Sequence, residues 1–372
     1  MLSDQEKAIY SRHIVLPEIG IKGQEALKNS KVLVIGAGGL GCPLLLYLTS
    51  CGIGKIGIID FDKISISNLH RQVLYNFEDI GKHKSQVAQK KLSVQNPYIK
   101  IEAYNFQLTN KNALELFSSY DIIIDGTDNF STRYLVNDAS EISGKPLVSG
   151  SIFKFEGQVS VFNYRNQDGL LGPSYRCLFP MPPSSEESPS CSEVGVLGVL
   201  PGIIGTLMAN EVIKIAAGLG QILSGKMLLF NSLKMNFNFI EFERELHPSI
   251  LAPNTKESFE KFEYEYFCNG GSQSEFKELS IEEFQKLLYE GKIQQLIDVR
   301  EPEELPHFLP KNCINVPLSY VEASFNQIHK DGLVVVFCNS GIRSKKAIAL
   351  LSKEFAFQNL YNLKGGIMQL VK

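Results

Sequence analysis

Two short segments of this 372-residue chain place glycines, charged side chains and a cysteine in patterns that could carry out chemistry. The first is the turn Gly36-Ala37-Gly38-Gly39-Leu40-Gly41, which separates an apolar run from a helix-forming run. Its glycines would let backbone N–H groups approach a phosphate at the N-terminus of a helix. Two acidic residues, Asp60 and Asp62, follow at the spacing of roughly 20 residues that is typical of a nucleotide-binding fold.

The residues after this acidic pair favour ATP over a dinucleotide. The segment Ser67-Asn68-Leu69-His70-Arg71-Gln72 contains amide and guanidinium groups, and Lys84 follows shortly after it. A nicotinamide site does not need such a cluster, whereas the oxygens of a triphosphate do. We therefore expect Asn68, Arg71 and Lys84 to bind phosphates.

A further acidic position completes this predicted site. Thr127-Asp128-Asn129 follows the short apolar run 121–125. In a parallel sheet the ligand lies beyond the carboxyl ends of the strands, where the glycine turn, Asp60 and Asp128 would converge. Asp60 is expected to accept hydrogen bonds from ribose hydroxyls, and Asp128 to hold magnesium. The full predicted ATP-binding set is Gly36, Gly38, Gly39, Gly41, Asp60, Asp62, Ser67, Asn68, Arg71, Lys84, Asp128 and Asn129.

The second segment is Cys338-Asn339-Ser340-Gly341-Ile342-Arg343, which lies between the apolar run 333–337 and a helix-forming run. A cysteine between a strand end and a helix N-terminus faces backbone N–H groups and the positive end of the helix dipole, and both favour the thiolate. Arg343 follows the cysteine one position earlier than the arginine of the phosphatase loop does. The shorter loop suits a persulfide.

The hydrophobic pattern predicts the elements that must hold these residues. Strand candidates lie at 31–35, 55–60, 99–104, 121–125, 226–231 and 237–243, and helices at 84–96 and 205–217. Alternation of strands and helices predicts an α/β fold with a Rossmann-like, mainly parallel sheet. A second, smaller α/β unit is expected to contain helix 280–290, strands 294–298 and 333–337, and helix 344–354.

Two irregular stretches divide this plan. Residues 165–193 are rich in Gly, Pro and Ser and are expected to form a long mobile crossing loop. The second stretch, residues 246–275, contains two prolines and the sequence Asn269-Gly270-Gly271-Ser272. We therefore expect an ATP-binding domain over 1–246, a linker over 247–275 and the second domain over 276–372.

The composition restricts the class of protein. A net charge of -3 gives no reason to expect a nucleic-acid surface. The polar N-terminus lacks the apolar core of a signal peptide, and the most apolar segment, 194–209, falls short of a membrane span. Seven scattered cysteines fit a reduced cytoplasm better than a disulfide framework. We expect a cytoplasmic protein that binds neither membrane nor nucleic acid.

With these motifs in order, residues 5–245 resemble the ubiquitin-activating-like adenylyltransferases of the MoeB and ThiF type. The matching motifs include Tyr10-Ser11-Arg12-His13, the glycine turn, the segment 67–72 and Glu156-Gly157-Gln158. The resemblance implies that the C-terminal Gly-Gly carboxylate of a ubiquitin-like sulfur carrier protein (MoaD/ThiS type) attacks the α-phosphate of ATP. It also implies that Arg12 reaches the phosphates bound by the partner subunit of a homodimer.

Residues 278–372 resemble a rhodanese domain. The matching segments include Asp298-Val299-Arg300-Glu301 and Leu363-Lys364-Gly365-Gly366. The resemblance implies that Cys338 carries a persulfide taken from a sulfur donor such as a cysteine desulfurase or thiosulfate. His307-Phe308-Leu309-Pro310 departs from the usual pattern, and there is no tryptophan near the end.

Together the two resemblances imply an enzyme that forms a carrier thiocarboxylate for molybdopterin synthesis, thiamine (thiazole) synthesis or tRNA thiolation. Cys191 would attack the acyl-adenylate or form an acyl disulfide, although a loop cysteine can also be incidental. The expected catalytic residues are Cys338, Cys191, Arg71, Arg12 and Asp128. A non-catalytic scaffold or sensor that binds nucleotide and carrier is the alternative, and a nicotinamide-dependent oxidoreductase lacks hydride-transfer partners.

Many relatives hold zinc with two CxxC pairs, and this chain lacks half of that set. Ser174 and Glu265 stand where the first cysteine of each pair would be, leaving Cys177 and Cys268. Structural zinc requires four nitrogen or sulfur ligands, so we expect no zinc. A poorer site with His247 as a further ligand is the competing hypothesis. Cys42 and Cys51 are expected in the core, and Cys313 is expected to be structural.

Overall fold

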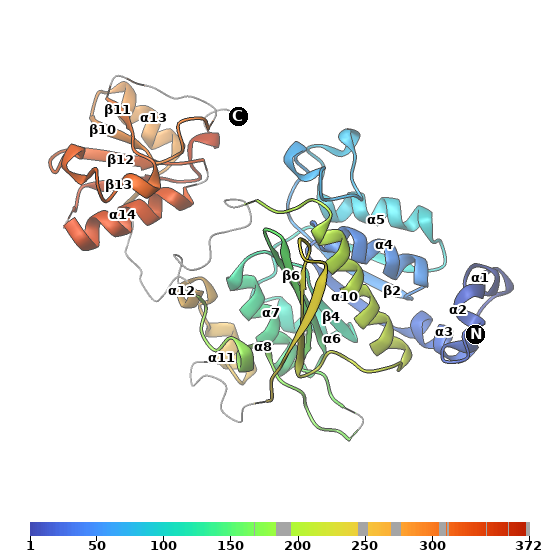
Figure 1. The fold of residues 1–372 in the computed structure, drawn as a ribbon. Coiled ribbons are helices and arrows are strands. Elements are labelled where there is room, and N and C mark those ends of the chain that lie inside the picture. The colour runs from blue at the N-terminus through green and yellow to red at the C-terminus, as the bar shows by residue number, and fades with distance from the viewer. Residues whose placement is uncertain are drawn as a thin grey trace. The chain divides into compact units, whose positions relative to one another are not determined.

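The chain folds into two compact units, Met1–Gly271 and Ser272–Lys372 (Figure 1). This computed structural model describes residues 1–166, 168–183, 195–244, 252–268, 277–304, 310, 312–339, 341–355 and 357–369. The first unit contains the predicted ATP site and the second the cysteine loop, and each is described by itself.

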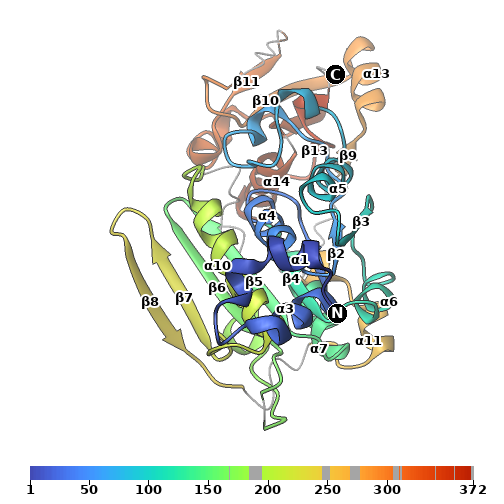
Figure 2. The same ribbon diagram turned by 90° about the vertical axis from the view of Figure 1, so that its right-hand side faces the viewer.

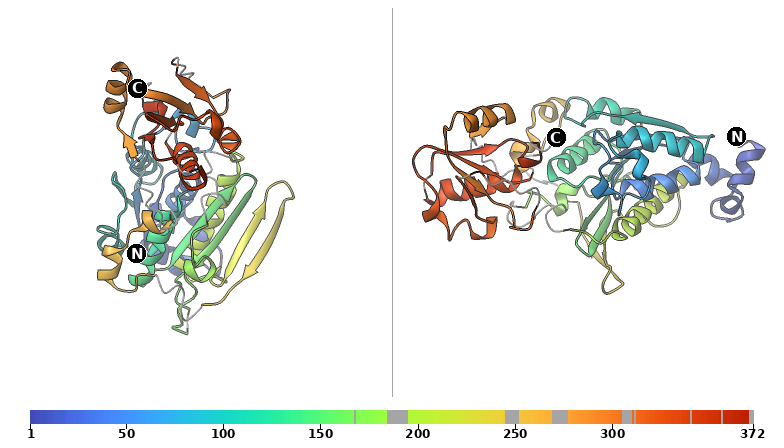
Figure 3. Two further views of the ribbon diagram at one scale, coloured as in Figure 1. Left: turned by 90° about the vertical axis from the view of Figure 1, so that its left-hand side faces the viewer. Right: turned by 90° about the horizontal axis from the view of Figure 1, so that it is seen from above.

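The first unit is built on an eight-stranded sheet with the order β3-β2-β1-β4-β5-β6-β7-β8. The strands are β1 Lys31–Ile35, β2 Lys55–Ile59, β3 Lys100–Tyr104, β4 Ile122–Asp125, β5 Leu147–Phe153, β6 Glu156–Phe162, β7 Lys226–Asn231 and β8 Asn236–Glu241. Strands β1 to β5 pair in parallel, whereas β5 to β8 pair antiparallel. Figure 3 shows the β7–β8 hairpin at one edge of this sheet. The predicted, mainly parallel α/β fold is confirmed.

The order in which strands are added to the sheet reverses at β1: β2 and β3 lie on one side of it, and β4 and the later strands lie on the other. Strand β1 has β2 on one side and β4 on the other, with Val34 opposite Ile58 and Ile124. Such a switch point opens a crevice beyond the carboxyl ends of the strands, where a ligand can bind. The glycine turn, Asp60 and Asp128 follow β1, β2 and β4 respectively, so all three lie at this edge.

Helices cover both faces of the sheet (Figure 2). Helices α4 Gly41–Cys51, α5 Lys84–Gln95 and α10 Leu200–Ala217 pack on one face, and α6 Ala113–Ser118 and α7 Phe130–Ile142 on the other. Successive side chains of β1 point to opposite faces of the sheet and so belong to different core clusters. Val32 and Val34 belong to the cluster on one face, and Leu33 and Ile35 belong to the cluster on the other. Three short helices, α1 Asp4–Ile9, α2 Ser11–Ile14 and α3 Gly20–Asn29, precede β1.

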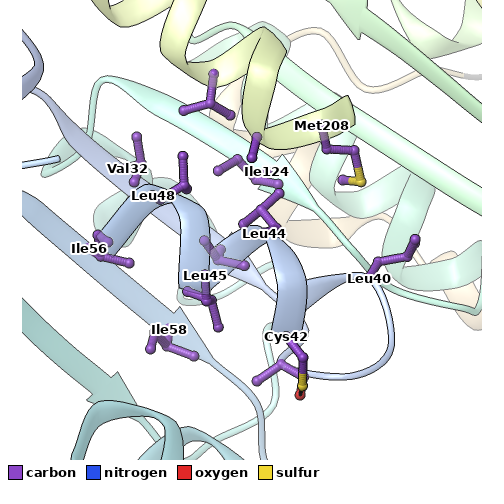
Figure 4. Packing of buried hydrophobic residues seen from close by; sticks show 14 of the residues in the cluster. Val32, Leu40, Cys42, Leu44, Leu45, Leu48, Ile56, Ile58, Ile124 and Met208 are labelled. Carbon is purple, nitrogen blue, oxygen red and sulfur yellow. Dashed lines mark hydrogen bonds between the residues drawn. The ribbon is translucent and has the colours of Figure 1, made fainter. Parts of the chain in front are cut away.

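Helix α4 forms the centre of one core cluster (Figure 4). Its residues Cys42, Leu44, Leu45 and Leu48 have no exposed surface. Burial of an aliphatic side chain of this size stabilises the fold by about 1.5–3 kcal/mol. Cys42 is therefore a core residue, as predicted, whereas Cys51 at the end of the helix is only partly buried. This packing fixes the helix whose N-terminus faces the predicted nucleotide site.

Helix α10 is long and apolar enough, by length and composition, to cross a membrane. In the fold it packs against α4, β5 and β6 instead. Its residues Leu200, Ile204, Met208 and Val212 are buried in the core cluster that contains α4. This burial in the core explains why α10 is so apolar. The helix begins at Leu200, earlier than predicted, because Pro201 is favourable in a first helical turn.

The two stretches predicted to be irregular are partly ordered. Within 165–193, helix α8 Tyr175–Leu178 contains the buried Tyr175 and Arg176, while residues 184–193 lie outside the described part of the chain. Within the predicted linker, α11 Lys256–Lys261 and α12 Tyr264–Cys268 pack against α7. Phe259, Tyr264 and Phe267 enter the core there, which gives this segment a hydrophobic anchor on the first unit.

The second unit is a five-stranded parallel sheet with the order β11-β10-β12-β13-β9. Its elements are β9 Lys277–Leu279, α13 Ile281–Tyr289, β10 Ile293–Asp298, β11 Cys313–Asn315, β12 Leu333–Phe337, α14 Ile342–Phe355 and β13 Leu360–Leu363. Strand β12 is central and buried, and Cys338 follows its carboxyl end. The smaller α/β unit predicted from the sequence is confirmed.

Candidate active sites

The glycine turn after β1 is a tight backbone cradle. Gly36 has φ +94°, and a Cβ there would lie 2.9 Å from the carbonyl oxygen of Gly126. A Cβ on Gly41 would lie 2.1 Å from the carbonyl oxygen of Gly36. Only glycine fits such positions, since other residues would clash or strain the backbone. Because α4 begins at Gly41, the free N–H groups of a helix N-terminus face this cradle.

Asp60 fixes the shape of the cradle. One of its carboxylate oxygens accepts from the N–H of Ala37 at 2.8 Å, and the other accepts from the N–H of Asp62 at 2.9 Å. Burial raises the pKa of this carboxyl, and the nearby Lys84 opposes that effect. Each carboxylate oxygen retains a second lone pair, so Asp60 can still accept from a ribose hydroxyl as predicted.

The predicted phosphate-binding residues form a rim around the cradle. Arg71 packs its side chain beside Gly39 and donates to the carbonyl of Ser67 at 2.8 Å. Lys84 is largely buried at the start of α5 and forms an ion pair with Asp62 at 2.8 Å. Asn68 closes a 3₁₀ turn by accepting from the N–H of Ser65. Arg71 therefore makes no contact with a carboxylate among the described residues, whereas Lys84 does.

The segment after β4 supplies exposed polar groups next to the cradle. Asp128 is exposed, and Asn129 caps α7 by accepting from the N–H of Thr132 at 2.9 Å. Beneath them, Arg133 lies 3.4 Å from the buried Asp125 and donates to the carbonyl of Thr127. This buried pair anchors the segment that presents Asp128.

Two residues that were not included in the predicted set complete the cradle. Tyr75 donates to the carbonyl of Ala37 at 2.8 Å, which ties the turn to the segment before α5. Gln72 is buried beside Gly38, and its Oε1 atom has no hydrogen-bond partner among the described residues. An unsatisfied buried amide oxygen is costly unless a ligand or water donates to it. Gln72 belongs to the segment 67–72, so the motif contained the signal.

The remaining predictions for this unit concern a metal and Arg12. In the described ranges of the chain, no group of three or more His, Cys, Asp or Glu residues could hold a metal ion. Magnesium commonly binds through one or two carboxylates plus substrate phosphates, so Asp128 is compatible with such a role. Arg12 is exposed on α2 and has no ion pair with the described residues of its own chain.

The region around Ser174 and Glu265, where the sequence predicts that a zinc site has been lost, contains a buried ion pair. Arg176 donates to Asp138 through two nitrogens, each at 2.7 Å, and Tyr264 donates to the same carboxylate at 2.8 Å. Ser174 contacts Cys177 at 3.5 Å, and Glu265 accepts from the hydroxyl of Ser131.

Two residues named in the predictions cannot be placed in the structure. His247 and Cys191 lie outside the described residues. Burial raises the pKa of Cys268 to about 12, so the free thiol is protonated at neutral pH.

In the second unit, the cysteine loop joins β12 to α14. Cys338 is buried, and its sulfur accepts from the N–H of Gly341 at 3.2 Å and from the hydroxyl of Ser344 at 3.5 Å. Both contacts favour a negatively charged sulfur. Gly366 packs beneath the loop, where a Cβ would lie 2.3 Å from the carbonyl oxygen of Asn339. Ser340 lies outside the described residues.

Two polar side chains of this loop, Asn339 and Arg343, share a partner that the sequence did not reveal. Glu304 accepts from both terminal nitrogens of Arg343, at 2.5 and 2.7 Å, and from the amide of Asn339 at 2.7 Å. A different, polar pocket is lined by Lys277, Lys330 and Leu333. Because Leu333 begins β12 and Cys338 follows its end, this pocket lies away from the cysteine loop.

Comparison with known proteins identifies the family of each unit. The ThiF family model matches residues 10–251. The chain belongs to the ThiF family. The model of the rhodanese-like domain matches residues 280–372, so the second unit is a rhodanese-like domain.

Some curated relatives match nearly the whole chain, and another matches about two thirds of it. The chain is 40% identical to a probable adenylyltransferase/sulfurtransferase MoeZ of Mycobacterium tuberculosis, over 100% of this chain and 94% of the relative. It is 48% identical to a sulfur carrier protein adenylyltransferase of Thermus thermophilus, over 70% and 95% respectively. It is 38% identical to the adenylyltransferase and sulfurtransferase MOCS3 of Xenopus laevis, over 96% and 85%. This ThiF-family chain is therefore an enzyme of the adenylyltransferase type with a sulfurtransferase domain.

Solved structures confirm the fold of the first unit. The structure of Escherichia coli MccB with ATP matches with a TM-score of 0.52 at 23% identity, covering 60% of this chain and 68% of that one. The structure of PaaA matches with a TM-score of 0.55 at 23% identity, covering 66% and 76%. At this level of identity the likeness concerns the fold alone.

Proposed function

We propose that this enzyme uses ATP to adenylylate the C-terminal Gly-Gly carboxylate of a ubiquitin-like sulfur carrier protein. The resulting acyl-adenylate then receives sulfur from a persulfide on Cys338. The main support is the nucleotide cradle, a glycine turn with the side chains of Gln72 and Arg71 beside Gly38 and Gly39. The buried Oε1 atom of Gln72 has no hydrogen-bond partner among the described residues. The thiolate-stabilising loop in the same chain supports the second step.

Adenylylation suits the groups at the first site. A carboxylate is ionised at pH 7, so its attack on the α-phosphate needs no general base. The C-terminal oxygen forms a bond to phosphorus, and the bond to pyrophosphate breaks. Negative charge develops on the phosphoryl oxygens, where Arg71, Lys84 and backbone N–H groups can stabilise it electrostatically. Magnesium held by Asp128 would add to this stabilisation when it is bound.

Sulfur transfer follows from the chemistry of a persulfide. The terminal sulfur on Cys338 attacks the acyl carbon of the adenylate, and AMP leaves with the bonding electron pair. A second thiolate then attacks the sulfur of Cys338, releasing the carrier thiocarboxylate and leaving a disulfide that an external thiol reduces. We propose Cys191 for this second thiolate. Cys191→Ala should leave adenylation intact but slow thiocarboxylate formation.

Several further properties belong to the same proposal. The carrier is of the MoaD/ThiS type, the product serves molybdopterin synthesis, thiamine synthesis or tRNA thiolation, and the enzyme works in the cytoplasm. It acts as a homodimer in which Arg12 reaches the partner's nucleotide. The exposed position of Arg12 without an ion pair to its own described residues is compatible with this role. The sulfur donor is a cysteine desulfurase or thiosulfate.

Exchange of labelled pyrophosphate into ATP tests the first step. Each Gly-Gly-ending carrier from the native cell is added in turn to the full-length enzyme. Arg71→Ala should lower the carrier-dependent exchange rate about 10²- to 10³-fold, the typical loss for one group that stabilises transition-state charge. Arg165→Ala, which removes an exposed arginine from the same unit, is the matched control. Absence of exchange with every carrier would refute adenylylation and favour a non-catalytic scaffold.

A further inference from the structure

The cysteine loop of the rhodanese-like unit is held by one carboxylate, Glu304. This carboxylate accepts from two nitrogens of Arg343, from the side-chain amide of Asn339 and from the N–H of Glu301 at 2.9 Å. Two of these partners flank the thiol, because Asn339 is adjacent to Cys338 and Arg343 lies in the first turn of α14, the helix that follows the loop. Glu304 therefore links both ends of the loop.

The same network is anchored on the sheet. Asn339 also accepts from Arg300 at 3.0 Å through its amide oxygen. Arg300 in turn donates to both carboxylate oxygens of Asp298, the last residue of β10, at 2.7–3.1 Å. The network runs from the sheet through Arg300 and Asn339 to Glu304 and Arg343. Each charged side chain in it has a counterion.

The electrostatic consequence concerns Arg343. The Arg343 and Glu304 side chains are 21% and 27% exposed, so water screens their attraction only in part. The hydrogen bonds from Arg343 hold the pKa of Glu304 below its ordinary value, which keeps the carboxylate ionised at neutral pH. The pair therefore carries no net charge. A loop whose arginine is neutralised in this way offers little attraction to a small anion.

Sulfur donors differ in the charge that they bring to this loop. With thiosulfate, the thiolate of Cys338 attacks the outer sulfur, an S–S bond forms, and sulfite leaves as a dianion with the electron pair. With a hydropersulfide, the outer sulfur passes to Cys338 with its proton, and a thiolate leaves with the electron pair. A nearby cation therefore favours the first donor more than the second, because its leaving group carries two negative charges rather than one.

We propose that Glu304 is a specificity-determining residue that withholds Arg343 from anionic donors, so that the loop favours a thiol persulfide over thiosulfate. This inference rests on the proposed function, because it needs Cys338 to accept sulfur. Glu304 acts through Arg343 and is a positioning residue. The donor class that fits is a persulfide on a cysteine, supplied by a small thiol or a protein.

Glu304→Gln in the full-length enzyme tests this role. Glutamine retains one acceptor oxygen, so it can still accept from either Asn339 or the N–H of Glu301, which donate to different oxygens of Glu304. It leaves the charge of Arg343 uncompensated. The rate of Cys338 persulfide formation is followed by intact mass spectrometry as a gain of about 32 Da. Two donors are compared, thiosulfate and an uncharged alkyl hydropersulfide released from a precursor. The measured quantity is the ratio of their kcat/KM values.

The ratio of thiosulfate to hydropersulfide should rise about fivefold to tenfold in Glu304→Gln, mainly through a lower KM for thiosulfate. Glu303→Gln makes the same charge change at an exposed neighbouring position and should change the ratio by less than roughly twofold. The double variant Glu304→Gln/Arg343→Gln should lose the gain, since the gain requires the arginine.

The other outcomes separate the possible failures. A purely structural role would lower the rates with both donors together and leave the ratio unchanged, which would overturn the inference. A gain that persists in the double variant would overturn it as well. If the wild-type enzyme forms no persulfide on Cys338 with either donor, the proposed function fails first, and the role of Glu304 falls with it.

Discussion

Replacing Asp138 should destabilise the first unit more than any single surface change. Asp138 is 2% exposed and accepts from Arg176 and Tyr264, which come from the two segments where the sequence predicts the loss of a zinc site. The remaining nitrogen of Arg176 has no hydrogen-bond partner among the described residues, but the guanidinium lies 4.8 Å from the ring centroids of Tyr134 and Phe267. An ion pair surrounded by aromatic rings therefore connects α7, α8 and α12.

The size of the effect follows from burial. Removing one partner of a buried ion pair leaves an uncompensated charge and costs about 3–5 kcal/mol. For a unit of this size, about 1 kcal/mol shifts the melting temperature by roughly 2–4 °C. Asp138→Asn should therefore lower it by at least about 6 °C. Tyr264→Phe removes one hydrogen bond to a charged group and should cost about 1.5–3 kcal/mol.

Differential scanning calorimetry of the full-length protein measures these shifts. Glu241→Gln breaks an exposed pair with Lys226 and is the control, with an expected cost below about 1 kcal/mol. Chelator should not change the melting temperature of the wild type. Equal shifts for Asp138→Asn and Glu241→Gln would refute the role of the ion pair. Near one zinc per chain, with chelation lowering the melting temperature, would show that a metal still holds this region.

Three other outcomes are expected. Gly41→Ala should lower the affinity for ATP more than about 100-fold in a binding titration, because its Cβ would lie 2.1 Å from a backbone carbonyl oxygen. Gly38→Ala is the control and should lower this affinity only slightly, because its Cβ would lie 3.6 Å from the nearest side-chain atom. Cys338→Ala should abolish persulfide formation and leave pyrophosphate exchange intact, with Cys313→Ala as control; mass spectrometry that finds the persulfide on another cysteine would contradict this. Burial alone would raise the pKa of Glu102, but hydrogen bonds from two lysines and a tyrosine lower it from 4.5 to about 2. Glu102→Gln should therefore lower the melting temperature at pH 7 by a difference that vanishes as the pH falls from 4.5 to 2, and a constant difference would contradict it.

Much of the fold was predictable because its signals are local. The apolar runs that became β1, β2 and β12 each end at a glycine or a functional residue, so a short window contains both the strand and its site. The glycine turn and the Cys338 loop were found for the same reason. The start of α10 was placed too late, because Pro201 and nearby glycines were interpreted as a loop although proline suits a first helical turn.

The features that were not predicted depend on contacts between distant segments. Strand β6 begins with the polar Glu156, and its pairing with β5 and β7 rather than its own pattern makes it a strand. Helix α12 falls within a predicted linker, and Phe267 is buried there only because α7 lies beneath it. Glu304 and Arg343 are 39 positions apart in the sequence, and no motif spacing predicts their contact.

The two sites use arginine in opposite electrostatic states. Arg71 contacts a carbonyl and a histidine, so among the described residues its charge has no carboxylate partner. Such a cation is free to stabilise charge on a phosphoryl group as that charge develops. Arg343 is fully paired with Glu304, so its contribution is to fix the loop around Cys338 rather than to attract an anion. Adenylylation develops charge on phosphoryl oxygens, whereas sulfur transfer between thiols exchanges one thiolate for another. The different pairing of the two arginines matches these different demands.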